Sequence, residues 1–166
     1  MIFFEKDKLD SEISKIINSY KIDELSYSLT LEKKKESYFA LLFAIFLCDL
    51  TSNKNLIFQD KTKISDKLIE NFFNFSRKRN IFDKSYLQLL TLTLSALYIV
   101  DGDNINFKEE FIKKVESNEI NVYDYLKKFR CLEGKPSSGN YAMFLALNTL
   151  KFLQVSPSNN ASGFIS

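Results

Sequence analysis

Residues 86–100 read YLQLLTLTLSALYIV, fifteen consecutive positions with no charged side chain, no glycine and no proline. A β-strand of about five or six residues is much shorter than this run, and nothing within it breaks a helix. We therefore expect a helix from about Lys84 to Val100. Because a helix that is apolar on nearly all sides needs neighbours around it, this stretch predicts a core of packed helices.

Two further runs are similarly apolar, although the second contains Lys151. Residues 38–48 (YFALLFAIFLC) lie within a helix expected from about Leu31 to Leu50, and residues 141–153 (YAMFLALNTLKFL) follow a predicted loop from Glu133 to Gly139, with Asn140 as the helix cap. The run at residues 38–48 has eleven uncharged residues, fewer than the 18 or so that span a bilayer. We expect three nearly all-apolar central helices and no membrane span.

The rest of the chain alternates apolar and polar side chains at helical spacing, around residues 9–20, 64–75, 107–115 and 122–129. Together with the apolar runs, this pattern predicts an all-α, single-domain bundle of about seven helices over residues 1–155. Residues 156–166 are expected to form a flexible C-terminal tail. A faint similarity between residues 38–58 and 86–107 leaves a helix-pair repeat of the HEAT or armadillo kind open.

The composition favours binding over catalysis. The 166 residues include no histidine, four glycines and two prolines, so the chain has no imidazole base and no glycine-rich phosphate loop. Neither cysteine has a histidine to activate it, and no serine lies in a nucleophile elbow. We expect a non-enzymatic protein with no cofactor.

Charge and cysteine usage predict an ordinary cytoplasmic chain. A formal net charge of +2 does not single out nucleic acid or membrane as the partner. Cys48 and Cys131 lie inside apolar patterns and are expected to be buried, reduced thiols. Charged residues follow Met1 to Phe4 at once, so no secretory signal is expected there.

The segment from Asp101 to Glu110 (DGDNINFKEE) is a candidate metal site. It resembles part of an EF-hand loop with Asp101, Asp103 and Glu110 as ligands, although Ile99 stands at the first ligand position and the glycine position holds no glycine. It is also similar to the metal-binding turns of TerB-type tellurite-resistance domains, which are all-helical. The favoured interpretation is an Asp-capped turn between helices, because short motifs often mislead. The metal alternative predicts a calcium-dependent rise in melting temperature.

The segment 61–84 is a candidate nucleic-acid surface because basic residues alternate there with phenylalanines. Its cations are Lys61, Lys63, Arg77, Lys78, Arg79 and Lys84. Phe72, Phe73 and Phe75 have the spacing of a core face, which favours a solvated helix end instead. The nucleic-acid alternative predicts an affinity that falls steeply with salt.

The favoured function is binding another protein, as a bacterial inhibitor, immunity or adaptor protein that neutralises or docks a partner such as a toxin. An acidic patch is the first candidate for the contact surface, since complementary charge speeds and orients association. The patch comprises Asp101, Asp103, Glu109, Glu110, Glu116 and Glu119.

Overall fold

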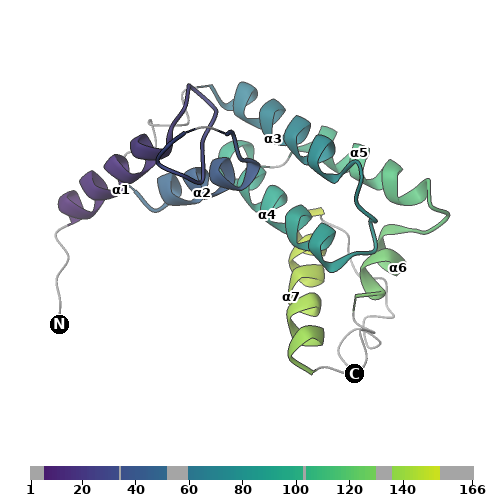
Figure 1. Cartoon of the computed structure of the whole chain (residues 1–166). Coiled ribbons are helices and arrows are strands. Elements are labelled where there is room, and N and C mark those ends of the chain that lie inside the picture. The colour runs from purple at the N-terminus through teal and green to yellow at the C-terminus, as the bar shows by residue number, and fades with distance from the viewer. Residues whose placement is uncertain (1–5, 34, 52–59, 103, 130–135, 154–166) are drawn as a thin grey trace. The chain divides into compact units, whose positions relative to one another are not determined.

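The computed structural model describes residues 6–33, 35–51, 60–102, 104–129 and 136–153. Within these ranges the chain forms helices and no strand (Figure 1). The helices are α1 (Lys6–Tyr20), α2 (Tyr38–Asp49), α3 (Lys61–Ser76), α4 (Lys84–Asp101), α5 (Ile105–Glu116), α6 (Val122–Lys127) and α7 (Pro136–Leu153). The predicted all-α class and the predicted number of helices are confirmed over the residues described.

The chain divides into two compact units. Unit 1 comprises Met1–Asn71 and Ile99–Gly102, and unit 2 comprises Phe72–Tyr98 and Asp103–Ser166. The boundary after Asn71 lies inside α3 and the boundary after Tyr98 lies inside α4, whereas the boundary after Gly102 follows the end of α4. The single domain expected over residues 1–155 stays a prediction, and the expected tail at residues 156–166 lies outside the described residues.

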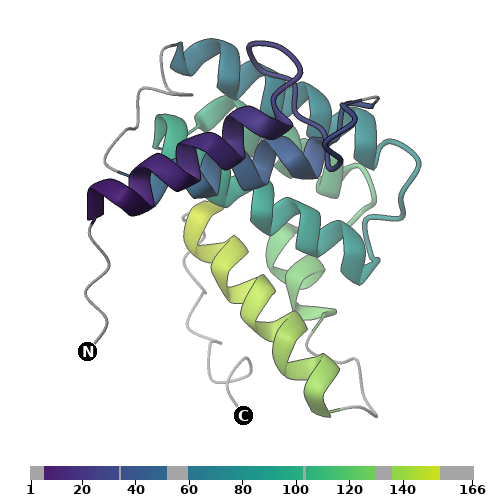
Figure 2. The ribbon, with the colours of Figure 1, turned by 60° about the vertical axis from the view of Figure 1, so that its left-hand side comes forward.

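Unit 1 is built on the packing of α1 against α2, and Figure 2 shows α1 running across α2. Ile13 and Ile17, four residues apart on α1, are buried, as predicted for an amphipathic helix. On α2, Leu41, Leu42 and Ile45 are buried, as are Ile64 and Leu68 on α3. The Tyr38 hydroxyl donates to the Leu68 carbonyl oxygen at 3.3 Å, which ties the start of α2 to α3.

Unit 2 has an aromatic core. The Phe72 ring centroid lies 5.3 Å from that of Phe107 on α5 and 5.6 Å from that of Tyr86 on α4, both with edge-to-face geometry. Tyr125 on α6 makes a similar contact with Phe111 at 6.0 Å, and its hydroxyl donates to the Ile81 carbonyl oxygen. Aromatic pairs of this geometry contribute about 0.5–1.5 kcal/mol beyond area burial.

The last helix is joined to α4 by polar and aromatic contacts within unit 2. The hydroxyls of Thr91 and Thr149 lie 3.1 Å apart, and each also donates to the carbonyl oxygen four residues earlier in its own helix. The rings of Tyr98 and Phe152 lie 5.7 Å apart. These buried hydroxyls are therefore satisfied in the core, as buried polar groups generally are.

Two helix starts differ from the prediction. The second helix begins at Tyr38 and not near Leu31, because Lys33 adopts a positive φ of 53° in a turn and Ser37 is extended. A later start also keeps the lysines out of the first helical turn, where the helix dipole opposes positive charge. The last helix begins earlier than predicted, at Pro136. Proline suits a first helical position, since its missing N–H has no partner there in any case.

The three apolar helices are not buried on all sides. Phe43 on α2 is 50% exposed, Tyr98 on α4 is 62% exposed and Phe144 on α7 is 59% exposed. Large apolar side chains that are exposed to solvent on regular helices indicate an interaction site when they lie close together. No helix of the described residues combines the length and the apolar character that crossing a membrane requires.

Candidate functional site

Unit 1 contains an apolar groove of about 210 Å³ between α1, α2 and the connection that joins them. Helix α1 contributes Ile16, Ile17 and Tyr20. The connection contributes Tyr27, Ser28 and Leu29. Helix α2 contributes Ala40, Phe43, Ala44 and Leu47. We call this the unit 1 groove, and none of the described residues that line it carries a charge.

The sequence of α2 accounts for the hollow. Ala40 and Ala44 are four residues apart and therefore lie on one face of the helix. Their methyl groups fill little space, whereas Phe43 and Leu47 beside them are large. A pair of small side chains facing a neighbouring helix leaves room that a Leu at either position would occupy. The groove is therefore a local consequence of two alanines in an otherwise bulky helix.

The connection forms a fixed wall of the groove because its backbone is hydrogen-bonded at both ends. The Ser28 amide donates to the Tyr20 carbonyl oxygen at 2.9 Å, and the Ser37 amide donates to the Tyr27 carbonyl oxygen at 2.8 Å. Lys21 and Tyr27 also form an antiparallel bridge. The end of α1 and the start of α2 thus hold Tyr27 between them.

Tyr27 is the unusual member of the lining. The residue is only 1% exposed, and its hydroxyl has no hydrogen-bond partner among the described residues. Burial raises the pKa of this phenol far above its usual range, with Cys48 and Asp23 adding to the effect. The hydroxyl is therefore neutral at physiological pH. An unpaired buried hydroxyl costs about 1–3 kcal/mol, so its presence calls for an explanation.

Cys48 affects the pKa of Tyr27, but its own thiol is unreactive. Its side chain is fully buried, as predicted, and burial raises the pKa of the thiol to about 11 while Lys21 opposes the rise. A thiol that stays protonated is a poor nucleophile. Cys131 lies outside the described residues, so its predicted burial stays a prediction.

Exposed apolar side chains border the groove. Ile16 is 47% exposed and Leu29 is 56% exposed, beside Phe43 on the α2 wall. Leu9, two turns before Ile16 on α1, is also exposed. The groove is therefore open to solvent and rimmed by large hydrophobic groups, which marks interaction sites more often than ordinary surface.

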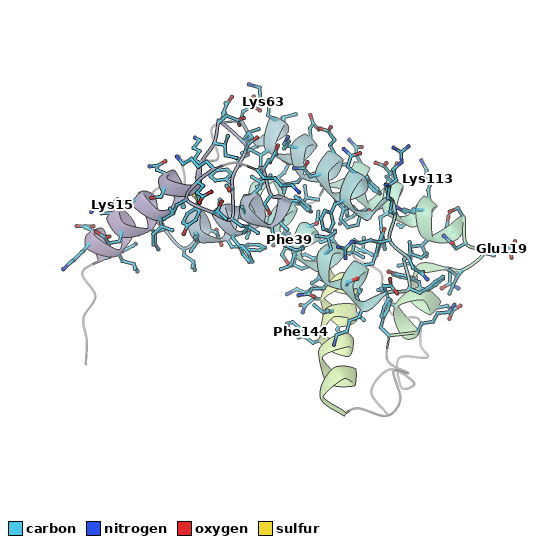
Figure 3. The ribbon with its side chains drawn as sticks, in the orientation of Figure 1. Lys15, Phe39, Lys63, Lys113, Glu119 and Phe144 are labelled. Carbon is cyan, nitrogen blue, oxygen red and sulfur yellow. The ribbon has the colours of Figure 1, made fainter. Side chains whose placement is uncertain are left out.

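The predicted acidic patch is divided between the two units. Asp101 is exposed at the end of α4 in unit 1, and Asp103 lies outside the described residues. In unit 2, α5 carries Glu109, Glu110 and Glu116, and the turn after it carries Glu119, all exposed. Figure 3 shows Lys113 and Glu119 projecting from this region. Lys113 follows Glu109 by four residues, so positive charge shares that helix face.

The predicted basic segment is also divided, and two of its cations have local partners. Lys61 and Lys63 lie on the part of α3 in unit 1, whereas Arg77, Lys78, Arg79 and Lys84 belong to unit 2. Lys63 forms a 3.5 Å ion pair with Asp60, and the Arg79 guanidinium lies 4.4 Å from the centroid of the Phe75 ring. Phe72 is buried in the core. Of the three phenylalanines considered for base stacking, Phe72 is therefore inaccessible, and Phe75, which is 37% exposed, has an arginine over its ring.

The predicted metal turn contains a helix cap, but the capping residue of α5 is Asn104 and not the expected aspartate. Asn104 accepts a 2.8 Å hydrogen bond from the Phe107 amide and so caps α5, and Gly102 has a positive φ of 71° that permits the turn. Asp101 and Glu110 are exposed. Among the described residues, which leave out Asp103, no group of three or more acidic or cysteine side chains is placed to hold a metal ion.

Neither the groove nor the buried Tyr27 hydroxyl was predicted from the sequence. The available signal was the pair Ala40 and Ala44, spaced by four in a run of large apolar residues. Nothing in the local sequence around Tyr27 distinguishes it from an ordinary core tyrosine. A comparison with known proteins found no family model that matches the chain, no similar curated protein and no similar solved structure.

Proposed function

We propose that this chain is a non-enzymatic protein-binding protein that takes an apolar segment of its partner into the unit 1 groove. The supporting observation is the groove itself, an uncharged hollow rimmed by Ile16, Leu29 and Phe43, each about half exposed. Partner proteins commonly place apolar anchors from a helix or an extended segment in such grooves.

The exposed rim can supply a substantial share of the binding free energy. Full burial of an isoleucine, leucine or phenylalanine side chain contributes about 1.5–3 kcal/mol. Since about half of each rim side chain is already covered by its own unit, covering the remainder contributes about 1 kcal/mol per residue. Removing one rim side chain is therefore expected to weaken binding about fivefold.

We extend this proposal to a more specific role, that of a bacterial inhibitor or immunity protein acting in the cytoplasm. Only the sequence composition supports this extension. The acidic residues of α5 are a secondary contact surface in this proposal, because Lys113 among them reduces the negative charge of that face. The nucleic-acid and metal alternatives stay predictions, each with its own test by salt titration or calcium addition.

The test is capture of the partner by a tagged full-length chain, with rim residues replaced in pairs. Phe43→Ala with Leu29→Ala removes two sides of the rim and is expected to weaken capture about thirtyfold, as two independent losses of about 1 kcal/mol. Phe144→Ala with Leu147→Ala is the matched control, because these side chains of α7 are 59% and 46% exposed and belong to unit 2. Figure 3 shows Phe144 projecting from α7.

Helical circular dichroism of both double variants establishes that they remain folded, as expected for exposed positions. The proposal predicts a large loss of capture for the groove pair and none for the control pair. Unchanged capture by the groove pair, or an equal loss for both pairs, would refute it.

A further inference from the structure

We propose that unit 2 carries a second binding surface, which takes single-stranded nucleic acid. We call it the loop surface, because it is centred on residues 77–83, the loop that joins α3 to α4. Its cations come from this loop, from α4 and α5, and from the end of α6, and they are Arg77, Lys78, Arg79, Lys84, Lys114 and Lys128. All of them belong to unit 2, so this inference is independent of the unit 1 groove.

The loop is held against α6, which adds Lys128 to the surface. The rings of Phe82 in the loop and Tyr125 on α6 lie 5.9 Å apart, and the Tyr125 hydroxyl donates to the Ile81 carbonyl oxygen (Figure 1). Ile81 is buried and anchors the loop. Lys128, which follows α6, has its Nζ 4.3 Å from the centroid of the Phe82 ring. A cation that is distant in the sequence is thereby placed beside the loop.

Helix α5 adds a further cation. The Nζ of Lys114 lies 5.6 Å from the ring centroid of Phe73 on α3, and equally far from that of Tyr86 on α4. Phe73 belongs to the last turns of the helix before the loop, and Tyr86 to the first turn of the helix after it. This ammonium group therefore lies beside both helices that the loop connects.

Positive charge is in excess on the loop surface. The carboxylates that adjoin its cations, in sequence or one helical turn away, are Asp83, Glu110 and Asp124. Among the described residues, no carboxylate forms an ion pair with four of the cations, namely Arg77, Lys78, Arg79 and Lys128. Lys63 in unit 1, by contrast, is paired with Asp60. The four cations are therefore available to an anionic ligand.

The two arginines of the loop favour phosphate groups and bases as ligands. Arg77 and Arg79 are two of the three arginines in the chain, whose other cations are lysines. Guanidinium is planar and forms paired hydrogen bonds to phosphate, whereas ammonium acts as a point charge. Arg79 is partly exposed, and its guanidinium lies 4.4 Å from the centroid of the Phe75 ring. A base that stacks on this guanidinium extends an existing stack, as bases do on arginine and aromatic side chains of single-strand binders.

Single-stranded nucleic acid fits this surface better than other anionic partners do. A duplex covers the faces of its bases and offers mainly phosphates. A lipid surface requires rings that enter hydrocarbon, but Phe75 and Phe82 each have a cation over the ring, and burying that charge in lipid is costly. An acidic peptide matches the charge without supplying a base to stack on Arg79. A single strand supplies both phosphates and exposed bases.

The experiment is fluorescence anisotropy of a labelled oligothymidylate of about 12 nucleotides, titrated with the full-length chain. If each of the four unpaired cations neutralises one phosphate, log affinity falls against log salt with a slope of about −3, at roughly 0.7 per contact for a single strand. The affinity is therefore expected to fall about fiftyfold between 50 and 200 mM salt. An abasic strand of equal length keeps the phosphates and is expected to bind at least about fivefold more weakly, which is the effect of one lost stack.

Two double variants and one conservative variant locate the site. Arg77→Gln with Arg79→Gln removes two contacts, so the salt slope is expected to fall to about −1.5. Lys61→Gln with Lys63→Gln is the matched control, because it removes the same charge from exposed positions of α3 in unit 1 and should keep the wild-type slope. Arg79→Lys keeps the charge but not the planar group, so it should retain the slope and lose the preference for the strand with bases. Helical circular dichroism establishes that all three remain folded.

Equal effects of the two double variants would overturn the inference, because they would indicate attraction by net charge alone. Equal binding of the abasic strand, an unchanged preference for bases in Arg79→Lys, or no binding at about 50 mM salt would also overturn it. Polyglutamate and phosphatidylserine vesicles are added as competitors at equal charge concentration. Displacement of the oligonucleotide by either one would assign the surface to an acidic protein or to a membrane, against the inference. The unit 1 groove is decided separately by partner capture with the Phe43 and Leu29 variants.

Discussion

Replacing Tyr27 by phenylalanine should stabilise the protein, which is unusual for a change at a core position. The Tyr27 hydroxyl is buried and unpaired, and such a group costs about 1–3 kcal/mol relative to water. Phenylalanine keeps the ring and its packing. We therefore expect the free energy of unfolding of Tyr27→Phe to rise by about 1 kcal/mol or more.

Tyr125→Phe is the control for this prediction, because it removes a buried hydroxyl that does have a partner. Tyr125 is as deeply buried as Tyr27, but its hydroxyl donates to the Ile81 carbonyl oxygen. Removing that hydroxyl loses a hydrogen bond and leaves a buried carbonyl oxygen without this donor, at a cost of about 1–3 kcal/mol. The two substitutions are chemically identical, yet they should change stability in opposite directions.

The assay is urea unfolding followed by circular dichroism at 222 nm, which is sensitive in an all-helical protein. In a thermal melt followed by the same signal, 1 kcal/mol corresponds to a shift in melting temperature of about 2–4 °C for a chain of this size. Because the chain has two compact units, tyrosine fluorescence should be recorded as a second probe to establish that the transition is cooperative. If Tyr27→Phe loses stability as Tyr125→Phe does, the hydroxyl has an internal partner, and the interpretation of it as an unpaired buried group fails.

Two further predictions concern a thiol and a helix cap. Because burial raises the pKa of Cys48 from 9.0 to about 11, the folded chain holds this proton where the unfolded chain loses it. The contribution of Cys48 to the free energy of unfolding should be constant below about pH 9 and fall between pH 9 and 11, so the loss of stability over that range should be less steep in Cys48→Ala. A Cys131→Ser variant, with Cys48 as its single cysteine, should react with a thiol reagent at pH 8 only when unfolded. Fast reaction of the native chain would contradict the assignment. Asn104→Ala should lower the free energy of unfolding by about 1 kcal/mol, because the hydrogen bond from the Phe107 amide is lost. Asn106→Ala, at an exposed position of the same helix, is the control and should have no such cost. Equal effects of the two substitutions in urea titrations would show that the cap is unimportant.

The helices could be predicted from the sequence because long uncharged runs allow few other structures. The run at residues 86–100 and the helix from Lys84 to Asp101 agree closely. Helix starts were less predictable, since they depend on local backbone geometry. Lys33 takes a left-handed conformation that no pattern of apolar residues indicates, and Pro136 begins a helix in a segment whose glycine and serines predicted a loop.

The candidate site could not be predicted because its parts are distant in the sequence. Ile16, Tyr27 and Ala44 come from two helices and the connection between them, and only the fold brings them together. Whether a buried hydroxyl is paired depends equally on tertiary geometry. Polar residues adjoin both Tyr27 and Tyr125 in the sequence, yet the hydroxyl of Tyr125 has a partner and that of Tyr27 has none among the described residues. Charge clusters are visible in a sequence, which is why the acidic and basic patches were the first candidates.

The most direct test of the central claim is site-specific photo-cross-linking in living cells. A photoreactive benzoylphenylalanine is placed at position 43 on the rim of the unit 1 groove, or at position 144 on α7, where Phe144 is similarly exposed. The account predicts that position 43 cross-links to one partner polypeptide and that position 144 does not. Cross-linking from position 144 with none from position 43 would contradict it.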